Sequence, residues 1–264
     1  MMTAKDKNKA YELIENALEK RKELLENKDD SIRNYFKSEA PPVLWFGDLN
    51  AEKPKVVVIS ANPNNPHEEG RIIPEGSSWD EKNPKIENLI DAYNNYFKNN
   101  PKTTWFGKEY KKTNKEQGRI EDFLNGLDAS FYDKTNKEEY TYQAIHIDIL
   151  PFATTESFSL IADELMTIDE LPEFINNHIR TLIEIIKPTL IIINGKTNFN
   201  YFNLCVNLGN APYKVLKYSV ERKSDIFISK NNNIIATSVN LGNNTYNYKD
   251  IKFVAEKLRD ELKF

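Results

Sequence analysis

The sequence predicts an α/β fold of three layers, in which a central, mostly parallel sheet is flanked by helices on both faces. Continuous apolar runs rich in β-branched residues recur at 55–60, 144–150 and 190–193, and such runs are typical of parallel strands buried on both faces. Segments with a helical spacing of apolar residues separate them. This alternation indicates a doubly wound sheet.

The expected elements follow in order along the chain. An amphipathic helix over 11–25 precedes the strand at 55–60, because Leu13, Ile14 and Ala17 recur near the helical period. Helices over 86–97 and 120–127 lead to the strand at 144–150, and a helix over 168–186 leads to the strand at 190–193. A helix after Gly195 is then followed by strands at 213–218, 225–229 and 234–239 and by an amphipathic helix over 248–262.

The length of 264 residues suits one large α/β domain over 1–264. Within it we expect an N-terminal helical extension over 1–40 and a core over 41–264. The interval at about 68–140 is polar and rich in Lys, Asn and Pro. We expect it to be an insertion of loops and helices that faces substrate.

The composition narrows the class of protein. The net charge is -4 and the isoelectric point about 5.6, values that disfavour a polybasic membrane binder and any protein that binds DNA without sequence preference. A local basic groove for DNA remains compatible with them. The single cysteine, Cys205, fits a reducing compartment, and no run has the length of a signal peptide or a membrane helix. We therefore expect a cytoplasmic protein that does not bind a membrane.

In a doubly wound sheet, ligands bind beyond the carboxyl ends of the strands. The first strand ends in Ser60-Ala61-Asn62-Pro63, and the loop continues through Asn64 to His67. Prolines fix backbone angles in this loop and asparagine amides are available as ligands, so we interpret it as a binding loop rather than a simple turn. An amide can orient a water molecule, although it is not a strong base.

The second buried strand carries two polar residues, His146 and Asp148, which alternation places on the same face of the sheet. A carboxylate among isoleucines is costly to bury unless it is paired, hydrogen-bonded or functional, and this favours a functional role for Asp148. His146 is better explained as a satisfied core histidine.

The third strand ends in Asn194-Gly195-Lys196, a glycine turn at the start of a helix whose backbone amides could hold a phosphate beside Lys196. The Walker pattern, a dinucleotide fingerprint, a Gly-x-Ser-x-Gly elbow and a metal-ligand motif are all missing from the sequence. We therefore expect neither a cofactor nor a metal.

Together these strand ends resemble the uracil-DNA glycosylase superfamily. Ser60-Ala61-Asn62-Pro63 is similar to the Gly-x-Asn-Pro motif of its mismatch-specific branch, and 84–88 to the Pro-Ser-Leu-x-Asn helix start of the classical branch. The resemblance covers roughly 43–243 and implies a monofunctional DNA glycosylase that flips a base out of DNA and leaves an abasic site. It makes Asn62 the residue that positions the attacking water.

Two departures from the family pattern are informative. Asp148 stands where the family has an Asn that reads uracil, and a carboxylate, which only accepts hydrogen bonds, suits the amino group of cytosine. The expected base is therefore of the cytosine type, such as a modified cytosine of phage DNA, with anti-phage defence as the role. The family's His-Pro-Ser or Asn-Pro-Ser loop is replaced by 237–243, in which Ser238 and Asn240 are the best substitutes.

The resemblance implies further site residues and a DNA partner. Ala61 would line the base pocket, and Trp79 or Phe152 would stack on the base, with core packing as the alternative for both aromatic residues. The DNA-binding candidates are Lys196, Gly195, His67 and Asn64. We expect a monomer.

Three alternatives stay open. The chain could be a uracil or mismatch DNA glycosylase, or a nucleoside-processing hydrolase, which the acidic isoelectric point fits better. It could also be a non-catalytic member of the fold that binds nucleic acid. Salt-dependent DNA binding separates a DNA enzyme from a nucleoside enzyme, and Asn62→Ala separates a catalytic protein from a non-catalytic one.

Overall fold

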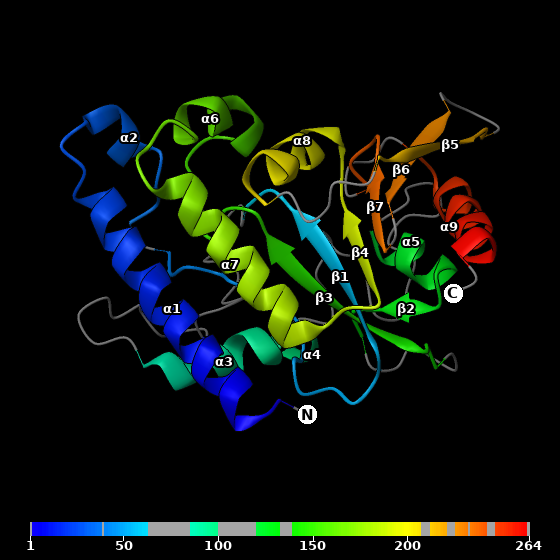
Figure 1. The fold of residues 1–264 in the computed structure, drawn as a ribbon, viewed down its shortest axis with the longest axis horizontal. Coiled ribbons are helices and arrows are strands. Elements are labelled where there is room, and N and C mark those ends of the chain that lie inside the picture. Colours follow the sequence, from blue (N-terminus) through cyan, green and yellow to red (C-terminus); the bar gives the residue numbers. More distant parts are fainter. Residues whose placement is uncertain are drawn as a thin grey trace.

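The computed structural model describes residues 2–38, 40–62, 85–99, 120–132, 139–206, 212–220, 225–231, 233–241 and 246–262. Its described residues form a seven-stranded sheet in the order β2-β3-β1-β4-β7-β6-β5 (Figure 1). Strands β2, β3, β1, β4 and β7 are parallel, and β6 and β5 join them antiparallel at one edge. The strands are β1 (Lys55–Ser60), β2 (Ala129–Ser130), β3 (Tyr142–Asp148), β4 (Leu190–Ile193), β5 (Lys214–Tyr218), β6 (Ile226–Asn231) and β7 (Ile234–Thr237). The predicted α/β class, with a mostly parallel sheet, is confirmed.

Helices cover both faces of the sheet. Those described are α1 (Ala4–Leu25), α2 (Asp30–Asn34), α3 (Ile86–Asn94), α4 (Tyr96–Asn99), α5 (Ile120–Gly126), α6 (Phe158–Leu165), α7 (Leu171–Ile186), α8 (Lys196–Cys205) and α9 (Tyr248–Leu262). Figure 1 shows α1 beside α7, and α5 packs against α9. The connections that contain α5 and α7 leave the middle of the sheet in opposite directions, so right-handed crossovers place these two helices on opposite faces. Within the described ranges, no helix has the length and apolar character needed to cross a membrane.

Most helices and strands lie close to the ranges expected from the sequence. Three further elements are present: α2, β2 and α6. The expected helix over 168–186 is shorter, because Glu170 has a left-handed backbone and Pro172 lies in the first turn of α7. The residues before it form α6, whose buried side chains include Phe158, Ile161 and Leu165. The two-residue β2 and the five-residue α2 are too short to give a periodic signal.

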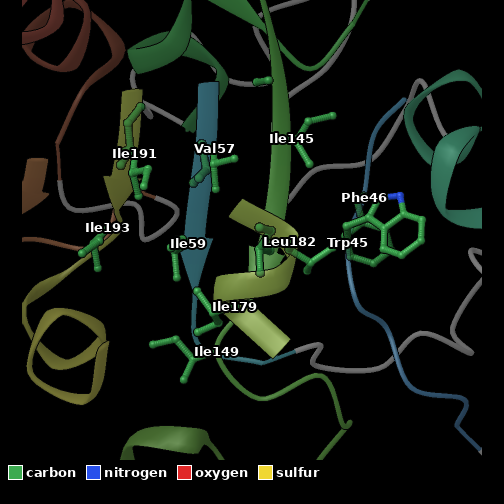
Figure 2. Packing of buried hydrophobic residues seen from close by; sticks show 14 of the residues in the cluster. Trp45, Phe46, Val57, Ile59, Ile145, Ile149, Ile179, Leu182, Ile191 and Ile193 are labelled. Carbon is green, nitrogen blue, oxygen red and sulfur yellow. The ribbon is translucent and has the colours of Figure 1, made fainter. Parts of the chain in front are cut away.

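The central strands are buried on both faces, as their continuous apolar runs predict. Figure 2 shows one of these faces, where the side chains at alternate strand positions lie beside α7. The labelled residues of this face are Val57, Ile59, Ile145, Ile191 and Ile193, with Ile179 and Leu182 on the helix. The intervening positions, which include Val58 and His146, point to the opposite face.

The N-terminal part of the chain holds a segment beside β3. Arg21 of α1 is buried and donates from Nε to the carbonyl of Ala40 at 2.8 Å. Further on, Phe46 and His146 exchange two backbone hydrogen bonds of 2.8 and 2.9 Å in an antiparallel bridge. The carboxyl half of β3 therefore has a partner on the side away from β1.

The topology creates a switch point between β1 and β4. The chain leaves β1 toward α5 on one face and leaves β4 toward α8, which contacts α7 on the other face. Connections that diverge in this way open a crevice at the carboxyl edge of a doubly wound sheet. This edge is where the sequence predicts the ligand.

Candidate functional site

Four buried polar residues lie in a row across the carboxyl edge of the sheet. Ser60 pairs with Asp148 in the β1–β3 ladder, and Asn194 and Thr237 follow Ile193 and Ala236, the last pair of the β4–β7 ladder. Paired residues of parallel strands point to the same face, so all four side chains lie on the face opposite α7. Their exposed fractions are between 0% and 5%. We call Asp148, Ser60, Asn194 and Thr237 the polar row.

The turn after β1 is fixed by the loop after β3. The ladder continues past the strands, because Ile149 N–H donates to the Ser60 carbonyl and Leu150 N–H to the Ala61 carbonyl, both at 2.9 Å. Asn62 Nδ2 donates to Thr154 Oγ1 at 2.8 Å, and that hydroxyl donates to the Glu156 carbonyl at 2.6 Å. The orientation of the Asn62 amide is thus set by Thr154. Pro63, Asn64 and His67 lie outside the described residues.

Asp148 and His146 form a buried pair on β3. Asp148 Oδ1 lies 3.5 Å from His146 Nε2, and both side chains are 3% exposed. The imidazole is stacked on Phe46 with 5.8 Å between ring centroids. Burial raises the pKa of the Asp148 carboxyl well above its usual value and lowers the pKa of His146 to about 3. Both shifts favour the neutral forms of the two groups, because each loses more hydration on ionising than the other returns.

His178 holds the end of β3 from the α7 side. Its Nε2 lies 3.3 Å from the carbonyl oxygen of Asp148, which can only accept, so Nε2 must carry the proton. The ring is stacked on Phe174 and buried, and burial lowers the pKa of His178 to about 4 although this hydrogen bond opposes the shift. His178 is therefore neutral, and it fixes the backbone that carries the Asp148 carboxyl.

Asn194 connects three strand ends. Its Nδ2 donates to Asn240 Oδ1 at 3.0 Å and lies 3.5 Å from Ser60 Oγ. Its Oδ1 accepts from the backbone N–H of Leu241 at 2.7 Å. Its own carbonyl accepts from Asn198 Nδ2 at 2.6 Å. The side chain thereby joins the ends of β1, β4 and β7.

The glycine turn after β4 differs from the expected phosphate cradle. Gly195 N–H donates to Thr237 Oγ1 at 3.0 Å, so this amide is used within the protein and is not the donor that a phosphate would find. Gly195 adopts φ +98° and ψ 151°, a conformation that essentially only glycine tolerates. Lys196, the first residue of α8, is exposed, as a phosphate contact requires.

The two candidates in the loop after β7 are separated by the structure. Ser238 N–H donates to the Phe227 carbonyl at 2.8 Å, and Ser238 Oγ accepts from Phe227 N–H at 3.1 Å. These bonds extend the β7–β6 ladder and join Ser238 to β6. Asn240 instead lies against Asn194. The choice between them depends on how the chain leaves β7, which strand alternation alone does not give.

Of the two candidates for stacking on the base, Phe152 and Trp79, the structure describes only Phe152. Phe152 is 2% exposed, and its ring is stacked on Phe174 with a centroid distance of 5.5 Å and meets Phe36 edge-on at 6.2 Å. These are the contacts of a core residue, and they account for Phe152 without a ligand. Trp79 lies outside the described residues.

Three residues of the site were not found from the sequence. The sequence places Asn194 only in a glycine turn, and it predicts no role for Thr154 or Thr237. Each acts through contacts with segments distant in the chain, such as the pair Asn194 and Asn240, 46 residues apart. Asn194 and Thr237 share one signal, a polar residue just after, or at the end of, a buried strand.

The described residues contain no group of three or more His, Cys, Asp or Glu side chains that could hold a metal ion. No protein-family model matches the chain, and no curated protein matches its sequence. The chemistry of the site must therefore be argued from its own residues.

Proposed function

We propose that this chain is a monofunctional DNA glycosylase that flips a cytosine-type base out of DNA and hydrolyses its N-glycosidic bond. The observation that carries the proposal is the polar row at the switch point, with the Asn62 amide next to it in a fixed orientation. Glycosidic cleavage passes through an oxocarbenium-like sugar, so it needs a positioned water and a stabilised leaving base more than a strong base. Amides and a neutral carboxyl can supply both.

Asn62 is the proposed water-positioning residue. Its Nδ2 donates to Thr154, so Oδ1 is the atom that would accept a hydrogen bond from the attacking water. Asn240, whose loop replaces the family's His-Pro-Ser, would stabilise the leaving base. Lys196 would contact a phosphate as an exposed cation.

Asp148 is the proposed base-reading residue. Its Oδ1 faces His146 Nε2, so Oδ2 is the oxygen that would meet the base. When the acid proton lies on Oδ1, Oδ2 is an acceptor, as it is in the ionised form, and an acceptor suits the exocyclic amino group of cytosine. Substituents at C5 leave this amino group in place. Modified phage cytosines would therefore be read as well, and anti-phage defence is the proposed role.

The test is mass spectrometry of free bases released from natural and phage DNAs. We expect cytosine-type bases from the wild-type protein, loss of release in Asn62→Ala, and a smaller loss in Thr154→Val, which removes the hydroxyl that orients Asn62 and donates to the Glu156 carbonyl. Asn177→Ala, at an exposed position on α7, is the matched control. Release of uracil alone would overturn the assignment of the base. Undiminished release by Asn62→Ala would overturn the assigned mechanism.

A nucleoside-processing hydrolase is the second candidate, because the isoelectric point of about 5.6 is unusually low for a DNA enzyme. The affinity of a DNA glycosylase for duplex DNA should fall steeply as salt increases, since bound cations are released from the phosphates. A nucleoside enzyme should release bases from free nucleosides and show no such slope.

The defence role has a separate test in cells. Expression of the wild-type chain should reduce plaque formation by phages whose DNA carries modified cytosine, and Asn62→Ala should not. Equal protection against phages with unmodified cytosine would argue against the role.

A further inference from the structure

The contact between Asn194 and Asn240 has a defined polarity. An asparagine amide has a donor end and an acceptor end, and rotation by 180° exchanges them. Which end meets a neighbour therefore decides which end meets a ligand. In this site the orientation of both amides follows from one neighbouring group that can only donate a hydrogen bond.

That group is the backbone N–H of Leu241, which can only donate. It lies 2.7 Å from the Asn194 side chain, so the atom that it meets must be Oδ1. Asn194 Nδ2 then points toward Ser60 and Asn240, at 3.5 and 3.0 Å. The Asn240 atom that receives this bond must be Oδ1. Asn240 therefore directs its donor, Nδ2, away from Asn194.

We propose that Asn194 is a positioning residue that sets the polarity of the Asn240 amide, so that Asn240 presents a hydrogen-bond donor to the leaving base. The inference rests on the proposed glycosylase function. When the glycosidic C–N bond breaks, its electron pair moves onto the base, water oxygen bonds to C1′, and one water proton passes in net to the base. The base carbonyl oxygen gains negative charge in this step, and a donor at that oxygen lowers the barrier.

The backbone near Asn240 is restrained as well. A Cβ atom placed on Gly195 would lie 3.5 Å from the N, Cα and Cβ atoms of Asn240, so the glycine turn packs directly against this residue. Leu241 is held by its bond to Asn194. Asn194 is 0% exposed, so water does not compete for its amide. Side chain and backbone of Asn240 are thus positioned by the end of β4.

Two isosteric variants test the kinetic consequence. Asn240→Asp keeps the acceptor for Asn194 and replaces only the donor end by oxygen. Asn194→Asp keeps the acceptor for Leu241 but turns an oxygen toward Asn240, which must rotate and present its own acceptor to the base. Both should lower kcat by about 100-fold, the usual effect of losing one donor at a developing negative charge, with KM for DNA nearly unchanged. A wild-type kcat in Asn240→Asp would overturn the proposal.

A titration tests the polarity without any activity, and it compares the carboxyl introduced by Asn240→Asp, at a half-buried position, with the same carboxyl in the double variant Asn240→Asp with Asn194→Ala. Because Asn194 Nδ2 donates to this position, the pKa of the introduced carboxyl should be lower when Asn194 is present than when it is replaced by Ala. A pKa that is higher with Asn194 present would mean that Asn194 presents its oxygen, and would overturn the proposal. If the wild-type protein releases no base from any DNA, the glycosylase proposal fails, while this titration still decides the polarity.

Discussion

At the scale of single residues, Asp148 is the proposed determinant of which base the site accepts. Its Oδ1 faces His146, and Oδ2 is the oxygen proposed to meet the base. In Asp148→Asn, the neutral imidazole of His146 can take the tautomer with its proton on Nε2, which places the amide oxygen near His146 and the amide nitrogen in the position of Oδ2. A donor at this position repels the cytosine amino group and attracts the uracil carbonyl. We expect the ratio of kcat/KM for cytosine-type over uracil-type substrates to fall by about 10- to 100-fold, equivalent to ~1–3 kcal/mol for one base contact.

The measurement is base release from matched duplexes that differ only in the target base. Asp148→Ala serves as the control, because it removes the acceptor without adding a donor and should weaken release of both bases. An unchanged preference in Asp148→Asn would show that residue 148 does not read the base. Circular dichroism verifies that the variants fold.

Sequence could indicate Asn62 and Asp148 because their signals are local. Asn62 precedes a proline at the end of a β-branched run, and Asp148 is a carboxylate within such a run. The parts played by Asn194 and Thr154 depend on which strand ends become neighbours, and this is a property of sheet order. The choice of Asn240 over Ser238 depends on one backbone turn after β7.

At the scale of elements, α5 and α9 are in close contact at Gly126. A Cβ atom added there would lie 2.6 Å from Ala255 Cβ and 2.8 Å from the carbonyl oxygen of Lys252. Helix propensity alone would make Gly126→Ala stabilising by about 0.5–1 kcal/mol. The contact predicts the opposite, because the two helices must move apart, and overpacking of this kind typically costs about 1–3 kcal/mol.

Urea unfolding of Gly126→Ala shows whether the substitution stabilises or destabilises the protein. The double variant with Ala255→Gly removes the nearer contact but leaves the Lys252 carbonyl, so it should recover only part of the lost stability. Stabilisation by Gly126→Ala would mean that the helices are not in close contact at this point.

The long elements were predictable because their apolar spacing continues over several turns, as in α7, or because their burial is continuous, as in β1. The break between α6 and α7 was not, because the left-handed residue there is a glutamate, which gives no turn signal. The packing of α5 on α9 could not be read from the sequence either. The two helices lie more than a hundred residues apart, and only the order of the strands brings them to the same face.

At the scale of the whole molecule, buried titratable groups oppose one another in their effect on stability. The pKa of Glu121 rises to about 7 through burial, although Ser130, Asn125 and the Phe131 N–H all donate to it. Its stabilising contribution is complete below its ordinary pKa of 4.5 and is lost as pH rises through about 7. Burial also raises the pKa of Asp148, so its contribution to stability is likewise lost as pH rises. For His146 and His178, whose pKa values fall to about 3 and about 4, stability is present above 6.5 and is lost as pH falls.

Between about pH 4.5 and 6.5 the contribution of Glu121 opposes those of the two histidines, since the unfolded chain binds protons at the histidines while the folded chain binds one at Glu121. Glu121→Gln removes one proton from the folded state. The free energy of unfolding of this variant, relative to the wild-type protein, should therefore rise with pH by about 1.4 kcal/mol per pH unit across this window. Urea unfolding at three pH values within this window measures the difference in unfolding free energy between the two proteins. The surface carboxylates contribute equally to both proteins and therefore cancel in this difference. If the unfolding free energies of the two proteins change in parallel with pH, Glu121 is ionised in the folded state. Its three hydrogen-bond donors would then lower its pKa more than burial raises it.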